Sequence, residues 1–393
     1  MTLRALGSRS EALALYVHWP FCVSKCPYCD FNSHVRSEID QVAWREALLA
    51  DLAHEARLLP GRRLTSIFFG GGTPSLMDPS TVEAVIDAAH GHWEVDAKIE
   101  ITLEANPNSV EATRFADLAA AGVNRLSLGL QSFDDSALRF LGRAHSAHEG
   151  FRALEIAQKN FRRVSFDLIY ALPGDTEDSW SAALAQALSL GTSHLSLYQL
   201  TIEPGTRLAT MVAKDQFEPL DPDASAALYE RTEAMTCSAG MPGYEISNYA
   251  RIGQESRHNL TYWRYGDYAG IGPGAHGRRL GARTVRHKKP ENFLLAVARN
   301  GHGIAEEAPL SALEAADEAL VMGLRLAEGV DVGSIEQRFD RAVIDWNRVD
   351  RLVASGHLTH DSGRIALTAR GRLLLDHILG EIALVEPRAL AVA

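Results

Sequence analysis

The chain of 393 residues has a formal net charge of −11 at pH 7, which argues against a general nucleic-acid binder because such proteins present basic surfaces. No run of about 18 apolar residues occurs, so no transmembrane helix is expected, and the first residues lack the apolar stretch of a signal peptide. The length predicts a substantial core and two domains.

Over residues 1–220, short β-type runs alternate with helical segments. Helices are expected at 41–59, 110–121 and 176–190, from apolar spacing or from glycines at their ends. Units of strand and helix that recur about every 30 residues are typical of an α/β fold with a parallel sheet. Six units predict a partial, open (β/α)6 barrel. Its expected strands are residues 14–21, 66–70, 98–104, 124–131, 164–171 and 194–200.

Beyond this barrel the pattern is less regular. Residues 221–308 predict an extension, with strands at 244–250 and 267–274 and a polar connector or lid at 283–292. Residues 309–393 predict a small helical domain. Its expected order resembles a winged helix: helices at 312–327 and 345–354, a hairpin turning at 361–363, and a helix at 370–379. We do not expect this domain to bind DNA, because the chain is acidic and winged helices often contact proteins.

Three of the four cysteines lie close together, as Cys22-Val-Ser-Lys-Cys26-Pro-Tyr-Cys29. Three thiolates at this spacing can bind three corners of an iron–sulfur cluster and leave the fourth iron open to a small molecule. A zinc site usually needs four protein ligands, and a redox Cys-x-x-Cys pair would leave Cys22 unexplained. Both alternatives stay open, but the spacing favours the cluster. The remaining cysteine, Cys237, is expected to be a buried structural thiol.

Distinctive residues follow the expected strands at their carboxyl ends, where sites lie in βα barrels. The cysteine loop follows the first strand and a triple glycine follows the second. The side chains expected at the ends of the next four strands are Glu104, Gln131, Asp167 with Tyr170, and Tyr198 with Gln199. The sequence therefore predicts one functional rim.

The segment Tyr16-Val-His-Trp-Pro-Phe-Cys22, the cysteine triplet and Gly70-Gly-Gly-Thr-Pro74 together resemble the radical S-adenosylmethionine (SAM) family. The resemblance is to its branch of oxygen-independent coproporphyrinogen III oxidase-like proteins. It implies that Cys22, Cys26 and Cys29 hold a 4Fe-4S cluster, that SAM binds the open iron, and that the cluster reduces SAM to a radical. The cofactor-binding residues implied are Tyr16, Gly71, Gly72, Thr73, Glu104, Gln131, Arg143 and Asp167.

Within this branch the chain departs from the coproporphyrinogen oxidases. Those enzymes carry a fourth cysteine two residues beyond the triplet, where this chain has Phe31, and a longer segment before the position of Tyr16. The chain more closely resembles the HemW-type heme chaperones, on the Cys-Pro-Tyr-Cys-Asp-Phe form of the triplet and on His258-Asn-Leu-Thr-Tyr-Trp263. This resemblance implies heme binding, with His258 as a candidate iron ligand. A buried histidine beside aromatic core residues is the alternative, and His276 is the rival ligand.

The expected function is therefore that of a heme chaperone with a 4Fe-4S cluster, SAM and heme as cofactors. Its expected partners are apo-hemoproteins, including respiratory enzymes, and not nucleic acid. The alternative is an enzyme, a radical SAM decarboxylase of coproporphyrinogen III in porphyrin biosynthesis, and the sequence leaves the choice open. An oxygen-sensitive cluster fits a reducing cytoplasm. Peripheral contact with the inner face of the membrane, and a homodimer, are left open.

Overall fold

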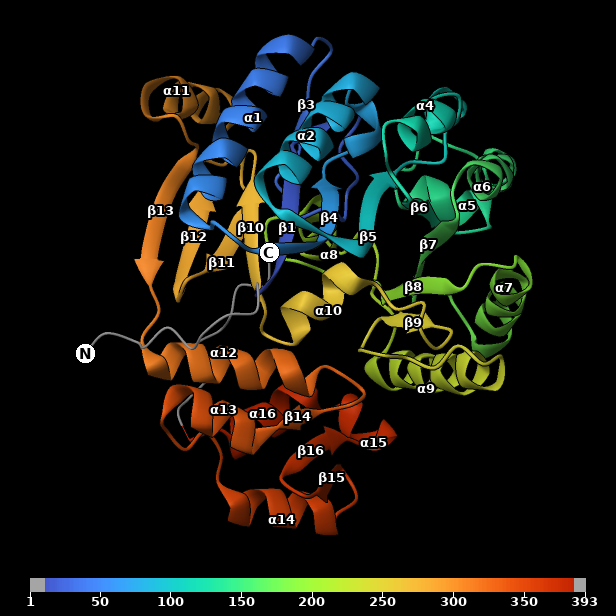
Figure 1. Cartoon of the computed structure of the whole chain (residues 1–393). Helices are drawn as coiled ribbons and strands as arrows, with labels where there is room; N and C mark the ends of the chain where they lie inside the picture. The colour runs from blue at the N-terminus through green and yellow to red at the C-terminus, as the bar shows by residue number, and fades with distance from the viewer. Residues whose placement is uncertain (1–10, 385–393) are drawn as a thin grey trace.

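The computed structural model describes residues 11–384, and its main element is an 11-stranded sheet in the order β13-β12-β11-β10-β1-β4-β5-β6-β7-β8-β9 (Figure 1). The expected six-stranded parallel barrel sheet is confirmed, and β10 adds a further parallel strand beside β1. Most residues of β6, β7 and β8 are buried, as expected when a parallel sheet is covered on both faces. The parallel strands are β10 (Asp267–Ile271), β1 (Ala12–Trp19), β4 (Arg63–Gly71), β5 (Glu94–Ala105), β6 (Arg125–Gln131), β7 (Arg163–Tyr170) and β8 (His194–Gln199).

The helices between the strands begin at polar caps. Asp40, Ser146 and Thr176 each accept a hydrogen bond from a backbone N–H of the first turn. The helix expected at 110–121 is instead two short helices, because Thr113 donates its hydroxyl to the Val110 carbonyl and interrupts the helical ladder. The barrel helices are α1 (Gln41–Leu58), α2 (Pro79–His92), α3 (Ser109–Ala112), α4 (Phe115–Ala120), α5 (Asp135–Phe140), α6 (Ala147–Asn160), α7 (Glu177–Ser189), α8 (Arg207–Val212) and α9 (Pro222–Ser238).

Antiparallel strands extend the sheet at both edges. At one edge β9 (Asn248–Ala250) pairs with β8, and it is shorter than the strand expected at 244–250. At the other edge β10 is followed by β11 (His276–Arg279), β12 (Ala282–Arg286) and β13 (Ile304–Pro309).

The expectation of a connector or lid at residues 283–292 is therefore wrong. This segment is most of β12 and the start of α11 (Pro290–Asn300). Its polar character misled the prediction because the Arg286 side chain is fully buried, and pairs there with Asp51 and Glu55 on α1.

The C-terminal residues form a separate hydrophobic core around the three-stranded sheet β14-β16-β15. Figure 1 shows this domain below the barrel. The expected winged-helix order of helices and hairpin is present, but the helix expected at 370–379 is two helices. Gly371 lies against the carbonyl of His357, and the chain turns at Leu373 and Leu374 before the next helix begins. The elements are α12 (Ala312–Leu324), β14 (Val330–Asp331), α13 (Val332–Phe339), α14 (Trp346–Ala354), β15 (Leu358–Asp361), β16 (Arg364–Leu367), α15 (Ala369–Arg372) and α16 (Leu375–Ile382).

None of the helices between residues 11 and 384 combines the length and the apolar composition that a membrane span needs. The N-terminal segment, in which no signal peptide was expected, lies at positions 1–10, outside the described residues. The division of the chain at residues 220 and 308 stays a prediction. Cys237 corrects another expectation: it is exposed rather than buried, because the inward face of α9 ends at Thr236.

Candidate cluster and cofactor site

The cysteine loop follows β1 and closes on itself through two short parallel strands, β2 (Phe21–Cys22) and β3 (His34–Val35). The backbone of the glycine segment after β4 docks on this loop. The Gly72 N–H donates to the Trp19 carbonyl at 2.7 Å, and the Thr73 N–H donates to the Phe21 carbonyl at 2.8 Å. The cysteine loop and the glycine segment are therefore one structural unit, although about 50 residues separate them in sequence.

The three thiols of this loop are unpaired and half-buried, and each has a polar neighbour. The Thr73 hydroxyl donates to Cys22 Sγ at 3.4 Å, and Arg143 Nη1 donates to Cys26 Sγ at 3.5 Å. Ser33 Oγ lies 3.8 Å from Cys29 Sγ. Hydrogen bonds to sulfur tune the charge and potential of an iron–sulfur cluster. This thiol environment therefore fits the expected cluster.

Burial raises the pKa of the Cys22 thiol to about 11, so this thiol is neutral at pH 7 until a metal displaces its proton. Within residues 11–384, no three His, Cys, Asp or Glu side chains converge on a position for one metal ion. A 4Fe-4S cubane does not need such convergence, because each thiolate binds a different iron atom. The arrangement fits a cluster better than the zinc ion that the spacing left open.

Glycine is required where β4 meets the cysteine loop. Gly71 has a φ of 111°, a conformation that side chains other than glycine rarely adopt. A Cβ on Gly71 would lie 2.6 Å from the His18 ring, and one on Gly72 would lie 2.7 Å from the Phe21 carbonyl oxygen. The His18 ring is itself fixed, between the Tyr16 hydroxyl at 3.0 Å and the Asn32 carbonyl at 2.9 Å. Glycine at these two positions therefore lets the backbone pack directly against the cysteine loop.

Two carboxyl groups lie at the carboxyl ends of the two barrel strands that flank β6. Burial and the nearby Asp167 carboxylate raise the pKa of Glu104, on β5, to about 8. Burial also raises the pKa of Asp167, on β7, to about 6, against hydrogen bonds from Ser196 and Ser127. Glu104 accepts a hydrogen bond from the Gly71 N–H at 3.2 Å. No cation pairs with either carboxyl group within the described residues, so both are suited to a cationic or hydroxyl-bearing ligand.

Arg143 connects this carboxyl end to the cysteine loop. Its Nη2 donates to Asn106 Oδ1 at 2.6 Å and to the Gly129 carbonyl at 2.9 Å. Its Nε is buried and has no hydrogen-bond partner among the described residues, so the guanidinium still offers a donor to a ligand. Gln131 ends β6 with a φ of 66° beside an irregularity in the strand. The amide nitrogen of Gln131 lies close to Gly129 and therefore faces the same rim.

The structure thus brings together the residues expected at the rim: Tyr16, Cys22, Cys26, Cys29, Gly71, Gly72, Thr73, Glu104, Gln131, Arg143 and Asp167. Tyr198 belongs with them, because it lies on β8 two residues after Ser196, whose side chain hydrogen-bonds Asp167, and therefore on the same face of the strand. Tyr170 and Gln199 do not. Tyr170 stacks on Trp180, and Gln199 donates to the Ser225 carbonyl. Both point away from the barrel interior because side chains alternate along a strand.

Asn106 was missed by the sequence interpretation. The side-chain amide nitrogen of Asn106 donates to Thr73 Oγ1 at 3.0 Å, and its Oδ1 accepts from Arg143. Asn106 therefore connects Thr73, which donates to Cys22, with Arg143, which donates to Cys26. The available signal was its position two residues after Glu104, on the same face of an extended chain.

His258 lies in the interior of the protein, with only 1% of its surface exposed and its ring centroid 6.3 Å from that of Tyr16. Its Nδ1 lies 2.9 Å from Ser66 Oγ, and its Nε2 lies 2.5 Å from the Tyr262 hydroxyl. Its ring stacks on Phe68, and burial lowers its pKa to about 3. Iron ligation would require the loss of one of these hydrogen bonds. The arrangement matches the alternative that the sequence left open, a buried histidine beside aromatic core residues.

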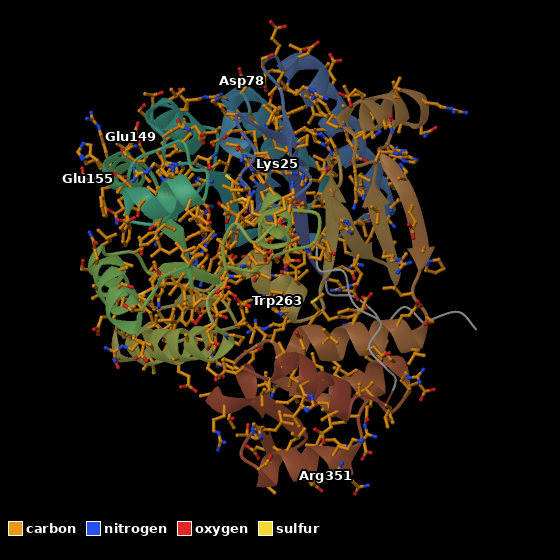
Figure 2. The ribbon with its side chains drawn as sticks, turned by 180° about the vertical axis from the view of Figure 1, so that it is seen from behind. Lys25, Asp78, Glu149, Glu155, Trp263 and Arg351 are labelled. Atoms are coloured by element: carbon orange, nitrogen blue, oxygen red, sulfur yellow. The ribbon has the colours of Figure 1, made fainter. Side chains whose placement is uncertain are left out.

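The rest of this motif also has structural partners. His258 lies on α10 (Arg257–Trp263), and Figure 2 shows Trp263 at the junction between the barrel and the C-terminal domain. There the Arg325 guanidinium lies 4.7 Å from the Trp263 ring centroid, a cation–π distance. His276, the rival ligand, is half-buried on β11, and burial lowers its pKa.

Comparison with known proteins identifies the family. The radical SAM superfamily model matches residues 16–187, and the HemN C-terminal domain model matches residues 310–374. Among solved structures, coproporphyrinogen III oxidase (HemN) from Escherichia coli, a radical SAM enzyme, superposes with a TM-score of 0.80. It is 24% identical, over 94% of this chain and 89% of that one. At this identity the likeness shows the fold alone.

Two relatives in sequence are similar over nearly the whole chain. Bovine radical S-adenosyl methionine domain-containing protein 1, mitochondrial, is 42% identical over 94% of this chain and 83% of its own length. Heme chaperone HemW of Escherichia coli is 37% identical over 93% of this chain and 97% of its own length. The chain therefore belongs to the HemW family of heme chaperones, within the radical SAM superfamily.

Proposed function

We propose that this protein is a heme chaperone that binds a 4Fe-4S cluster, SAM and heme, and delivers heme to apo-hemoproteins such as respiratory enzymes. The observation that carries the proposal is the similarity over 93% of the chain to a protein named heme chaperone. Phe31 agrees with it. This residue occupies the position of the fourth cysteine expected in the oxidases, and its side chain is 53% exposed.

The cysteine loop supplies the cluster ligands in this account. Cys22, Cys26 and Cys29 hold three iron atoms and leave the fourth without a protein ligand. When bound, the cluster supplies the electron that cleaves SAM. The hydroxyl of Thr73 and the guanidinium of Arg143, which donate to two of the sulfurs, stabilise the negative charge of the thiolates.

The rim residues would bind SAM at the open corner. Glu104 accepts a hydrogen bond from the methionyl ammonium of SAM. The positive charge of that ammonium lowers the raised pKa of Glu104 towards its ordinary value. Arg143 donates its free Nε–H to the methionyl carboxylate. Asp167 accepts from ribose hydroxyls, and Gln131 supplies an amide donor and acceptor. Gly71 and Gly72 let the backbone reach the ligand, and Tyr16 orients His18 against them.

The alternative is an oxygen-independent coproporphyrinogen III oxidase. The HemN-like fold supports it, because the same rim serves radical chemistry on a substrate. Phe31 weighs against it. Peripheral membrane contact and a homodimer stay predictions.

Anaerobic reconstitution followed by two assays on one sample separates these functions. The first is a heme titration by absorbance, and the second is conversion of coproporphyrinogen III with SAM and a reductant. The chaperone predicts stoichiometric heme binding without turnover. Formation of protoporphyrinogen IX would overturn the proposal.

A further inference from the structure

Two of the three cysteines in the loop are joined by a continuous network of side-chain hydrogen bonds, here called the Asn106 network. It runs from Cys22 through Thr73, Asn106 and Arg143 to Cys26. Its members come from the cysteine loop, the glycine segment after β4, the end of β5 and the turn between α5 and α6. Asn106 is at its centre, because its amide nitrogen bonds to Thr73 and its amide oxygen to Arg143.

The direction of each hydrogen bond in this network follows from its arginine. A guanidinium has no acceptor atom, so Arg143 Nη2 donates, and the Asn106 atom that lies 2.6 Å from it is the amide oxygen. The amide nitrogen of Asn106 therefore faces Thr73 Oγ1 and donates to it at 3.0 Å. Because Thr73 Oγ1 accepts there, its own hydrogen points elsewhere, to Cys22 Sγ at 3.4 Å. Sulfur that binds iron as a thiolate has no hydrogen to give, so this direction suits a cluster ligand.

Asn106 is held in position by protein contacts on its other side. It follows β5 directly, and its backbone N–H donates to Glu111 Oε2 at 2.8 Å. Glu111 is only 1% exposed, and the side chains of Asn108 and Ser75 also donate to its carboxylate. Ser75 lies two residues after Thr73, so one buried carboxylate fixes the backbone near both Asn106 and Thr73. The Asn106 amide is therefore well placed to orient the hydroxyl.

Hydrogen bonds to the sulfur ligands change the reduction potential of an iron–sulfur cluster. Reduction adds negative charge to the cluster, and a donor aimed at sulfur stabilises the more negative, reduced form more strongly. Each such hydrogen bond therefore raises the potential. The N–H of Asn106 leaves the Thr73 hydrogen for sulfur and, by polarising the hydroxyl, strengthens that bond.

We propose that Asn106 is a positioning residue for the cluster, which aims one donor at Cys22 Sγ and another at Cys26 Sγ and thereby raises the cluster's reduction potential. The proposal rests on the part of the proposed function that places a 4Fe-4S cluster on this loop. It names a residue that sets a property of the cluster without contacting it. Cys29 lies outside this network, because its polar neighbour Ser33 belongs to the cysteine loop itself.

The test is an anaerobic redox titration of the reconstituted full chain without SAM, in which electron paramagnetic resonance follows the reduced cluster. Asn106→Asp keeps the size and an oxygen for Arg143 but has no N–H for Thr73, whose hydroxyl then donates to the new carboxylate instead of Cys22. Thr73→Val should therefore lower the midpoint potential in the wild-type background and leave it unchanged in the Asn106→Asp background. The comparison within each background cancels the charge that the aspartate adds. An equal shift in both backgrounds would overturn the proposal.

A second variant, Asn106→Leu, removes the amide without adding charge. We expect it to lower the midpoint potential, and to lower it by less when Thr73 is already valine, because both substitutions act on the same hydrogen bond. Ser33→Ala is the matched control, since it removes a hydroxyl beside Cys29 Sγ that does not depend on Asn106. Its shift should add to that of Asn106→Leu. An unchanged potential in Asn106→Leu, or full additivity with Thr73→Val, would contradict the proposal.

The outcomes separate this inference from the proposed function. Iron and sulfide content and the cluster absorbance show whether each variant is loaded. If the wild type takes up no cluster, the cluster of the proposed function is wrong and this inference falls with it. If the wild type is loaded but its potential does not respond to the Asn106 variants as expected, only this inference fails. Should Asn106→Leu not retain the cluster, the two Asn106→Asp titrations decide. Loss of the cluster from both Asn106 variants would make Asn106 a structural residue of the loop and overturn its role in setting the potential.

Discussion

The buried ion network between α1 and the antiparallel edge of the sheet gives a sharp stability prediction. Arg286 is fully buried and donates to Glu55 at 2.6 Å and to Asp51 at 3.3 Å. Burial would raise the pKa of Glu55, but Arg286 and Arg279 hold it below its usual value. Asp51 also accepts from the backbone N–H groups of Gly272 and Gly303. The network therefore joins the helix after the cysteine loop to β12 and its neighbours.

Removing one partner leaves uncompensated charge in the interior. Arg286→Met fills a similar volume, but Asp51 then loses its ion pair and Glu55 keeps only Arg279. We expect the free energy of unfolding to fall by about 3–5 kcal/mol, the usual cost of breaking a buried pair. The double variant Arg286→Met with Glu55→Gln removes one of those charges as well, and should recover part of the loss.

Arg283→Met is the control on the same strand. Arg283 pairs with Glu306 at 3.4 Å, and both side chains are more than half exposed, so its loss should cost less than about 1 kcal/mol. Urea unfolding of the apo protein under reducing conditions, followed by circular dichroism, measures all three variants without the metal. Equal losses for Arg283→Met and Arg286→Met would refute the reasoning.

Three further predictions concern the interior and the rim. Folding raises the pKa of Glu104 from 4.5 to about 8, so the folded apo protein holds this proton more tightly than the unfolded chain. Its free energy of unfolding should therefore fall as the pH rises through that range. Urea unfolding at a series of pH values should show a weaker pH dependence of this free energy for Glu104→Gln. His258→Ala should lower the free energy of unfolding by about 2–4 kcal/mol, because packing is lost and the hydroxyls of Ser66 and Tyr262 lose their partner. The magnetic circular dichroism spectrum of bound heme should stay unchanged. Loss of the signature of imidazole ligation from that spectrum would instead identify His258 as the iron ligand. Arg143→Lys keeps the positive charge but loses the planar set of guanidinium N–H donors. Anaerobic calorimetry should therefore show SAM binding weakened at least tenfold. An unchanged affinity for SAM would mean that Arg143 does not contact it.

Much of the barrel could be predicted from the sequence, because each strand and the segment after it carry local signals. The strand expected at 194–200 differs from β8 by one residue, since apolar residues and the preceding Gly191 mark it. The rim followed from one rule, that functional side chains gather at the carboxyl ends of parallel strands. Local pattern and topology were therefore sufficient for Glu104, Gln131 and Asp167.

The misses share a physical cause: the deciding contacts are distant in sequence. Arg286 made its segment look like a polar connector because its partners Asp51 and Glu55 lie more than 200 residues earlier. His258 looked available for iron because Ser66, which lies 2.9 Å from its Nδ1, is 192 residues away. Burial and hydrogen-bond satisfaction of such side chains are properties of the folded chain, not of its local pattern.

Heme transfer tests the central claim most directly. The reconstituted protein is loaded with heme, mixed with an apo-hemoprotein, and followed by the absorbance of the acceptor. A chaperone that hands heme over in a complex predicts a transfer rate that rises with acceptor concentration. A rate that is independent of acceptor concentration and equal to spontaneous heme release, or no transfer at all, would contradict the account.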